Sequence, residues 1–429
     1  MLPPFDPWLS ASCAADVAAA SQSGPDALAT LRDGRLAALL EAAGRGSALY
    51  RPLLQGRDPA AVRLHELPVM HKASLMRRFD DWVTDPLLRL DDLRRFTADA
   101  SRIAEPFLGR YVVWESSGSS GEPGIFVQDA SAMAAYDALE ALRRPVLRPL
   151  QRALDPWGLG ERVAFVGATG GHFASTVSIE RLRRLNPALS RGLHGVSFLQ
   201  PTERLVAQLQ ALQPTIVATY PSAAVLLAEE QAAGRLDIAP QEIWTGGETL
   251  SPVKRRFIEQ SFGCPVANSY GASEFLTLAF DCPHGRLHLN SDWAILESVD
   301  DHGAAVPDGQ PGSTALLTNL ANHVQPLIRY DLGDSITLHA PGCACGSMLP
   351  VVEVQGRCDD TLRLGRPGTP AVRVLALALS TVLEDDAGLF DFQVLQQGPC
   401  DLLLRTGLDG AAGQRAVRRA RSVTRSPRS

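Results

Sequence analysis

Lysine is nearly absent from this chain of 429 residues: Lys72 and Lys254 are the only two, and arginine supplies the remaining fixed positive charge. The formal net charge of −6 excludes a general attraction to nucleic acid or to anionic lipid. No apolar run reaches the roughly 20 residues of a membrane span, and the opening residues lack the basic segment of a secretion signal. We therefore expect a cytoplasmic protein that binds neither nucleic acid nor membrane.

Cysteine is also scarce, and the seven cysteines are odd in number and widely spread, which argues against a disulfide framework. Cys343 and Cys345 nevertheless stand one residue apart, and Cys282 is followed closely by His284 and His288. Thiolate and imidazole groups in a set of four suit structural zinc. A zinc site is therefore predicted, with the choice between the two histidines open and metal-free reduced thiols as the alternative.

The order of apolar segments predicts an α/β fold. Residues 1–107 have helical spacing broken by glycine and proline, whereas later segments alternate between short apolar strands and helices. One such strand, 215–219, precedes a helix that opens at Pro221, and Ser251 with Pro252 makes a good start for another. Alternation of this kind is typical of parallel βαβ units.

Domain boundaries follow from changes in this pattern. Beyond Asp281 the chain becomes rich in strands and turns, which predicts a β-rich lobe. We predict a large domain over residues 1–355, including the helical N-terminal segment, and a small, shortened α+β domain over 356–429. Six arginines after Gly413 predict a frayed basic tail over about 413–429.

The most informative stretch is the Ser/Gly loop from Ser116 to Gly124, with the sequence SSGSSGEPG after an apolar run. Small residues let a backbone approach a bulky anion closely, and successive N–H groups in such a turn can bind phosphate. The loop is not a Walker A motif, because Gly121 is followed by Glu122 and not by lysine with serine or threonine. We predict a triphosphate-binding loop, with a flexible linker as the alternative.

Three further motifs follow in order: TGGETL at 245–250, NSYGASE at 268–274 and PLIRYDLGD at 326–334. The first two end predicted parallel strands, where such sheets place ligand sites. Together with the Ser/Gly loop and Gly356-Arg357-Cys358-Asp359-Asp360, they resemble the adenylate-forming superfamily, and within it the phenylacetate–CoA ligase branch. The resemblance covers roughly residues 67–360.

This resemblance implies an adenylate-forming enzyme fold and an ATP site. The Ser/Gly loop would hold the β- and γ-phosphates, two motifs would enclose the adenine with the Tyr270 ring stacked on it, and Asp334 would accept hydrogen bonds from the ribose hydroxyls. The residues implied in nucleotide binding are Ser116, Ser117, Gly118, Ser119, Ser120, Gly121, Gly247, Glu248, Ser269, Tyr270, Gly271, Ser273 and Asp334.

Three residues are implied in catalysis. By resemblance, Glu274 would hold Mg²⁺, and Arg357 would reach the nucleotide from the side of the small domain. His172 lies where related enzymes place acyl-pocket residues, and either a contact with the substrate carboxylate or a place in the core is open to it. The plain alternatives are a core aromatic for Tyr270, a solvated carboxylate at a helix start for Glu274 and a turn cap for Asp334.

The implied activity is ATP-dependent conversion of an aryl or other hydrophobic carboxylic acid to an acyl-adenylate. Transfer to coenzyme A, or to the phosphopantetheine of an acyl carrier protein, would follow, and a homodimer is an open alternative for the assembly. The same branch pairs a Cys–His segment with a later Cys-x-Cys, which implies zinc ligation by Cys282, His288, Cys343 and Cys345.

Two departures from the family pattern limit this reading. Glu122 stands where family loops usually carry lysine, and no lysine follows Lys254, although many members use one from the small domain. Arginine does not simply replace lysine at a tight point-charge site. Transfer to an amine, use of an unusual oxyanion such as nitrite, and a catalytically weakened nucleotide-binding module therefore stay open as alternatives.

Overall fold

The computed structural model describes residues 3–116, 123–155, 158–360, 362–365, 372–374, 379–380, 382–386, 389–390 and 392–406. Ser117, Gly118, Ser119, Ser120 and Gly121 of the Ser/Gly loop, and the basic tail, lie outside these residues. No helix in the described parts of the chain is both long and apolar enough to cross a bilayer.

The N-terminal segment is helical, as its spacing predicts. Its elements are α1 (Pro7–Ala20), α2 (Pro25–Gly46), α3 (Arg51–Leu54), η1 (Leu64–Glu66), α4 (Lys72–Arg77), α5 (Phe79–Trp82), α6 (Leu90–Thr97) and η2 (Ala100–Arg102). A hairpin of β1 (Val112–Glu115) and β2 (Ile125–Gln128) follows and carries the Ser/Gly loop at its tip. Helix α7 (Ala130–Arg143) then packs along α1.

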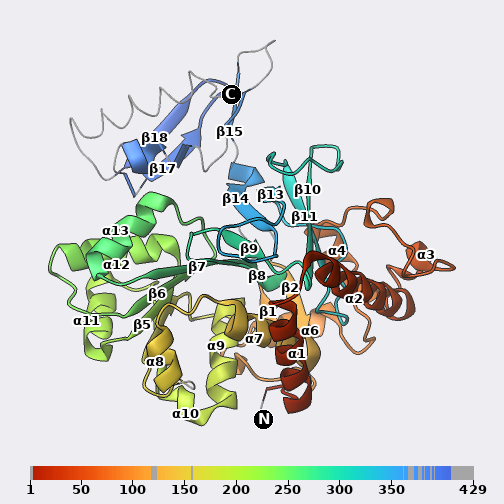
Figure 1. Ribbon diagram of the computed structural model, residues 1–429, viewed down its shortest axis with the longest axis horizontal. Coiled ribbons are helices and arrows are strands. Elements are labelled where there is room, and N and C mark those ends of the chain that lie inside the picture. The colour runs from red at the N-terminus through yellow and green to blue at the C-terminus, as the bar shows by residue number, and fades with distance from the viewer. Residues whose placement is uncertain are drawn as a thin grey trace.

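The centre of the molecule is a mixed nine-stranded sheet with the order β13-β14-β9-β8-β7-β6-β5-β3-β4 (Figure 1). Strands β4, β3, β5, β6 and β7 run parallel, and the rest of the sheet is antiparallel. The strands are β3 (Val163–Gly167), β4 (Leu193–Ser197), β5 (Ile216–Thr219), β6 (Glu242–Gly246), β7 (Val266–Ala272), β8 (Phe275–Asp281), β9 (Leu287–Leu289), β13 (Asp334–His339) and β14 (Val351–Arg357).

Helices connect the parallel strands, which confirms the predicted α/β class. They are α9 (Ala174–Leu185), α10 (Pro187–Ser190), α11 (Thr202–Leu212), α12 (Pro221–Ala232) and α13 (Pro252–Phe262), while α8 (Pro149–Leu154) precedes β3. The Ser251 hydroxyl accepts a hydrogen bond from the Lys254 N–H, and Gly263 ends α13 in the left-handed conformation at φ 66°. Local capping chemistry therefore sets both ends of this helix.

A β-rich lobe follows the sheet, as predicted beyond Asp281. It contains a three-stranded sheet of β10 (Ala294–Val299), β11 (Thr314–Asn319) and β12 (Tyr330–Asp331). Strand β14 continues to Arg357, so the large sheet extends two residues past the predicted boundary at 355. Later elements are η3 (Cys358–Asp360), β15 (Leu362–Leu364), β16 (Val372–Val374), η4 (Val382–Asp386), β17 (Phe392–Gln396) and β18 (Leu402–Thr406).

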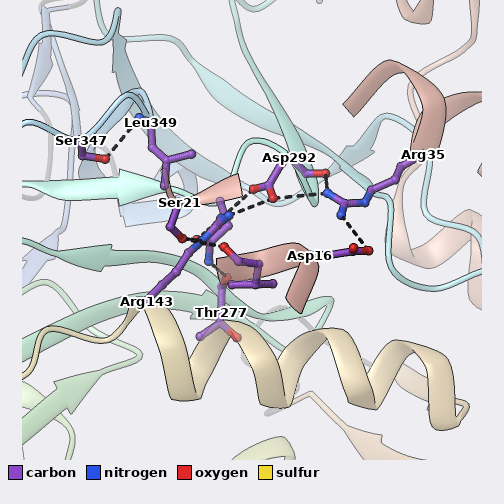
Figure 2. Close-up of polar contacts among 10 residues, drawn as sticks. Asp16, Ser21, Arg35, Arg143, Thr277, Asp292, Ser347 and Leu349 are labelled. Carbon is purple, nitrogen blue, oxygen red and sulfur yellow. Dashed lines mark hydrogen bonds and ion pairs between the residues drawn. The ribbon is translucent and has the colours of Figure 1, made fainter. Parts of the chain in front are cut away.

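A buried ion-pair network fastens the N-terminal helices to the sheet (Figure 2). The fully buried Asp292 carboxylate accepts hydrogen bonds from both terminal nitrogens of Arg143, at 2.6 and 2.9 Å. Arg35 of α2 approaches the same carboxylate at 3.3 Å and stacks over the Trp293 ring at 3.6 Å. Because the charges pair inside the protein, removal of the shared carboxylate would leave two cations without their main partner.

Candidate active site

A single cavity of about 2680 Å³ lies at the carboxyl ends of β5, β6 and β7. This volume exceeds the roughly 300–1000 Å³ of a site for one small molecule, so a nucleotide and a second substrate fit together. The cavity brings together every described nucleotide-site residue of the sequence prediction and two of the three catalytic candidates, Glu274 and Arg357. These lining residues are Ser116, Gly247, Glu248, Ser269, Tyr270, Gly271, Ser273, Glu274, Asp334 and Arg357.

Asp334 is held by two partners from neighbouring strands. The Tyr270 hydroxyl donates to Oδ2 at 2.7 Å, and Nη1 of Arg357 donates to Oδ1 at 3.0 Å. Asp334 begins β13 and pairs in register with Arg357 at the end of β14, so the sheet itself sets this geometry. Burial raises the pKa of Asp334, and burial together with Asp334 raises that of Tyr270, which therefore stays protonated as the donor.

Glu274 lies in the tight turn between β7 and β8 and not at a helix start, which removes the helix-dipole alternative. A Cβ on Gly271 would come within 1.9 Å of the Leu276 carbonyl oxygen, so only glycine permits this turn. The Tyr330 hydroxyl donates to Oε1 of Glu274 at 2.7 Å. Burial raises the pKa of Glu274, and the Tyr330 hydrogen bond and the charge of Lys72 oppose that rise.

Lys72 was not assigned from sequence, yet it lines this cavity at the start of α4. The Lys72 side chain packs against Gly124, the last residue of the Ser/Gly loop. A Cβ added to Gly124 would lie 3.3 Å from Cδ of Lys72. The preceding segment is fixed by paired backbone hydrogen bonds, from Met70 N to Arg329 O and from Asp331 N to Met70 O. One of the two lysines of the chain therefore lies beside Gly124, and its charge acts on Glu274.

Comparison with known proteins gives three results. Residues 179–316 match the AMP-binding enzyme family. Protein CapK of Staphylococcus aureus is 28% identical over 152 residues, which cover 35% of this chain and 32% of CapK, so the match spans about a third of that relative. A 2-hydroxyisobutyryl-CoA ligase in complex with 2-HIB-AMP superposes with a TM-score of 0.64 at 21% identity, covering 91% of this chain and 82% of that one.

The chain has the adenylate-forming enzyme fold, and its residues 179–316 are similar to AMP-binding enzymes. An anthranilate CoA ligase in complex with anthranoyl-AMP shares the fold more distantly, with a TM-score of 0.50 and 15% identity over 72% of this chain and 60% of that one. The resemblance inferred from the motifs is thus confirmed for the fold and, over residues 179–316, for the similarity to AMP-binding enzymes, while the narrower branch stays a prediction.

The rest of the candidate site is built from backbone turns. Ser116 closes the base of the Ser/Gly loop, since its N–H donates to Gly124 O and its hydroxyl accepts from Gly124 N, both at 2.8 Å. Gly247 has φ 79° and faces the Tyr220 ring, which a Cβ would approach within 3.0 Å. The Glu248 carboxylate caps α12 by accepting from the Ser222 N–H and hydroxyl, both at 2.9 Å.

His172 is the one predicted catalytic residue that the structure moves away from the site. Its side chain is buried, Nε2 lies 3.0 Å from the Asp99 carbonyl oxygen, and its ring meets Phe96 edge-on at 5.3 Å. Among the described residues, the cavity lining includes its neighbours Phe173 and Ala174 but not His172. The structure therefore places the His172 side chain in the core, and we no longer propose that it contacts the substrate carboxylate.

The predicted zinc ligands Cys282, His288, Cys343 and Cys345 come together, with their ligand atoms all within 4.8 Å of one another. The Cys282 and Cys343 sulfurs are 3.9 Å apart, close to the roughly 3.8 Å of two thiolates on one tetrahedral zinc. His288 Nδ1 lies 3.0 Å from the Leu349 carbonyl oxygen, which orients Nε2 toward the thiols. His284 instead lines the large cavity, so the donor set fits zinc with His288 as the fourth ligand.

Proposed function

We propose that the protein uses ATP to convert a carboxylic acid into an acyl-adenylate and then transfers the acyl group to a thiol, in the manner of a phenylacetate–CoA ligase. The observation that carries the proposal is the convergence of Asp334, Tyr270, Arg357 and Glu274 on one cavity. The bound 2-HIB-AMP of the similar 2-hydroxyisobutyryl-CoA ligase supports the same type of intermediate.

In the first step, a carboxylate oxygen of the acid attacks the α-phosphorus of ATP. A new O–P bond forms while the bond from the α-phosphorus to the bridging oxygen of the β-phosphate breaks, and pyrophosphate leaves with its electron pair. Lys72 and Ser116 line this cavity, and their proposed contribution to stabilising this charge is electrostatic and positional. Mg²⁺ held by Glu274 would neutralise phosphate charge in the same place.

In the second step, a thiolate attacks the acyl carbonyl carbon, the C–S bond forms, and AMP leaves as the C–O bond breaks. Asp334 and Tyr270 keep the adenosine in place during this exchange. Arg357 stays within reach of the nucleotide because its guanidinium is tied to Asp334 Oδ1 at 3.0 Å and to the Leu332 carbonyl at 2.7 Å. Coenzyme A and a carrier-protein phosphopantetheine are the proposed acceptors.

Zinc has a structural part in this proposal. Cys282 and His288 come from the segment around β8 and β9, and Cys343 and Cys345 come from the loop after β13. A closed set of four protein ligands leaves no open coordination position for substrate. The ion would therefore join two loops of the large domain beside the cavity.

Exchange of radioactive pyrophosphate into ATP over a panel of carboxylic acids tests the first step. We expect exchange that requires both an acid and Mg²⁺, that is lost in Glu274→Gln, and that is unchanged in Asp308→Asn, an exposed carboxylate outside the cavity. Mass spectrometry of products with coenzyme A, a holo carrier protein, amines and nitrite then identifies the acceptor. Absence of exchange with every acid, in folded protein that binds AMP, would refute the proposal.

A further inference from the structure

The residues immediately before Lys72 are fastened to the β-rich lobe. The Met70 N–H donates to the Arg329 carbonyl oxygen at 2.9 Å, and Met70 pairs in parallel with Tyr330 of β12. Three residues earlier, the Leu67 carbonyl oxygen accepts a hydrogen bond from Nη1 of Arg329 at 2.7 Å. Arg329 therefore binds this segment twice, through its own carbonyl oxygen and through its guanidinium, and α4 begins with Lys72 shortly after these contacts.

Arg329 also holds a backbone conformation that residues with a Cβ rarely adopt. Its φ is 50°, in the left-handed region. Such a conformation persists only where the surroundings fix it. Here the residue is only 5% exposed, its N–H donates to the Thr318 hydroxyl at 3.1 Å, and its Nε donates to Oε2 of Glu297 at 3.0 Å. Strands β10 and β11 of the lobe therefore keep Arg329 in this unfavourable conformation.

The guanidinium of Arg329 joins two parts of the molecule. Its Nε meets the Glu297 carboxylate on β10, and its Nη1 meets the Leu67 carbonyl at the approach to α4. A planar guanidinium presents its donors in fixed directions, whereas a lysine has one nitrogen on a flexible stem. The link therefore depends on the shape of the side chain as well as on its charge.

Residues on both sides of this link line the cavity. Lys72 begins α4, and Tyr330, the next residue after Arg329, donates to Oε1 of Glu274 at 2.7 Å. Among the described residues, Arg329 itself is not part of the cavity lining. Because Glu297 also pairs with its charge, an effect of Arg329 on a bound nucleotide must pass through the residues that it holds.

We propose that Arg329 is a positioning residue that holds Lys72 at the phosphates of bound ATP. This inference rests on the proposed function, in which the Lys72 ammonium stabilises phosphate charge. Removal of the guanidinium releases the segment at Leu67, so that the ammonium spreads over more positions and a smaller share of them contacts phosphate. The effect should concern ATP and not AMP, because AMP lacks the β- and γ-phosphates.

Titration calorimetry with ATP and with AMP, both with Mg²⁺ present, tests this inference through a double-mutant cycle. We expect Lys72→Met to weaken ATP binding about tenfold or more, as for one hydrogen bond to a charged group, and to leave AMP binding within about threefold. Arg329→Met should likewise weaken ATP binding about tenfold and spare AMP. In the Lys72→Met background, Arg329→Met should weaken ATP binding less than about twofold, because the side chain that it positions is gone.

The matched control is Arg181→Met, because Arg181 is also a buried arginine, pairs with Asp137 at 2.9 Å, and lies outside the cavity lining. It should leave the affinity for both nucleotides unchanged. Arg329→Met/Glu297→Gln provides a second variant that folds more easily, because it removes both charges of the buried pair. It should show the same selective loss of ATP binding, and Arg329→Lys should restore only part of the affinity.

Three results would each overturn the inference. They are equal losses for ATP and AMP in folded Arg329 variants, an undiminished loss of ATP binding in the Lys72→Met background, and a Lys72→Met variant that binds ATP like the unmodified protein. None of them would overturn the proposed function, which fails when pyrophosphate exchange is absent with every acid.

Discussion

Replacement of Asp334 by alanine should weaken the binding of AMP by about two to four orders of magnitude. Each carboxylate oxygen of Asp334 already accepts one protein hydrogen bond, Oδ2 from Tyr270 and Oδ1 from Arg357. An ionised carboxylate offers about four acceptor positions, so each oxygen retains one for a ribose hydroxyl. At about 1.5–3 kcal/mol for each hydrogen bond to a charged group, two such bonds contribute about 3–6 kcal/mol, and about 1.4 kcal/mol corresponds to a factor of ten.

Asp334→Asn should weaken the binding of AMP less than Asp334→Ala does, by about one to two orders of magnitude, because the amide replaces only one of the two acceptor oxygens by a donor. Titration calorimetry with AMP measures both variants without depending on the identity of the acid. Asp308→Asn, an exposed carboxylate outside the cavity, is the matched control and should bind AMP like the unmodified protein.

An Asp334→Ala variant that is folded and binds AMP within threefold of the unmodified protein would refute the ribose assignment. Asp334 would then serve only to hold Tyr270 and Arg357 in place. The melting temperature distinguishes this result from misfolding, since a variant that has lost its fold cannot report on the contact.

Four further outcomes are expected. Glu274→Gln should raise the melting temperature of the ligand-free protein at pH 7, because burial raises the pKa of Glu274 and the folded protein holds its ionised form at a cost. Thermal melts should show this gain shrinking as the pH falls through the raised pKa and vanishing below the usual value of 4.5. Lys72→Met should lower kcat/KM for ATP about 10- to 100-fold, with incomplete rescue by Lys72→Arg in steady-state assays. Metal analysis should find one zinc per chain, lost in Cys345→Ser together with several degrees of melting temperature, and zinc-free native protein would contradict the site. Asp292→Ala should cost about 3–5 kcal/mol in urea unfolding, because Arg143 loses its buried partner, and a loss below 1 kcal/mol would count against the network.

Much of the site was predictable because its motifs lie at ends of strands. Residues 245–250 and 268–274 each follow a parallel strand, and neighbouring parallel strands bring their carboxyl ends to one edge. The Cys/His cluster was likewise predictable from its residue types and close spacing. Spacing alone left His284 and His288 open and the family resemblance favoured His288, whose place in the cluster depends on the pairing of β9 with β14.

Other features have no local signal. Lys72 is separated from Glu274 by about two hundred residues, and it enters the cavity because Met70 pairs with the segment around Tyr330. The scarcity of lysine was the only hint in the sequence. His172 follows strand β3, just as the motifs at 245–250 and 268–274 lie at the ends of β6 and β7. Its ring nevertheless packs in the core against Phe96.

The sequence by itself determined the fold class, the ends of helices such as α13, and the residues that line the cavity at the ends of β6 and β7. These depend on periodicity, capping and strand ends, which act over a few residues. Only the tertiary structure decided that Tyr330 supports Glu274, that His172 belongs to the core, and that Arg329 holds the segment before Lys72. Each of these depends on which distant segments pack together, and that is set by the burial of the whole chain and not by any single motif.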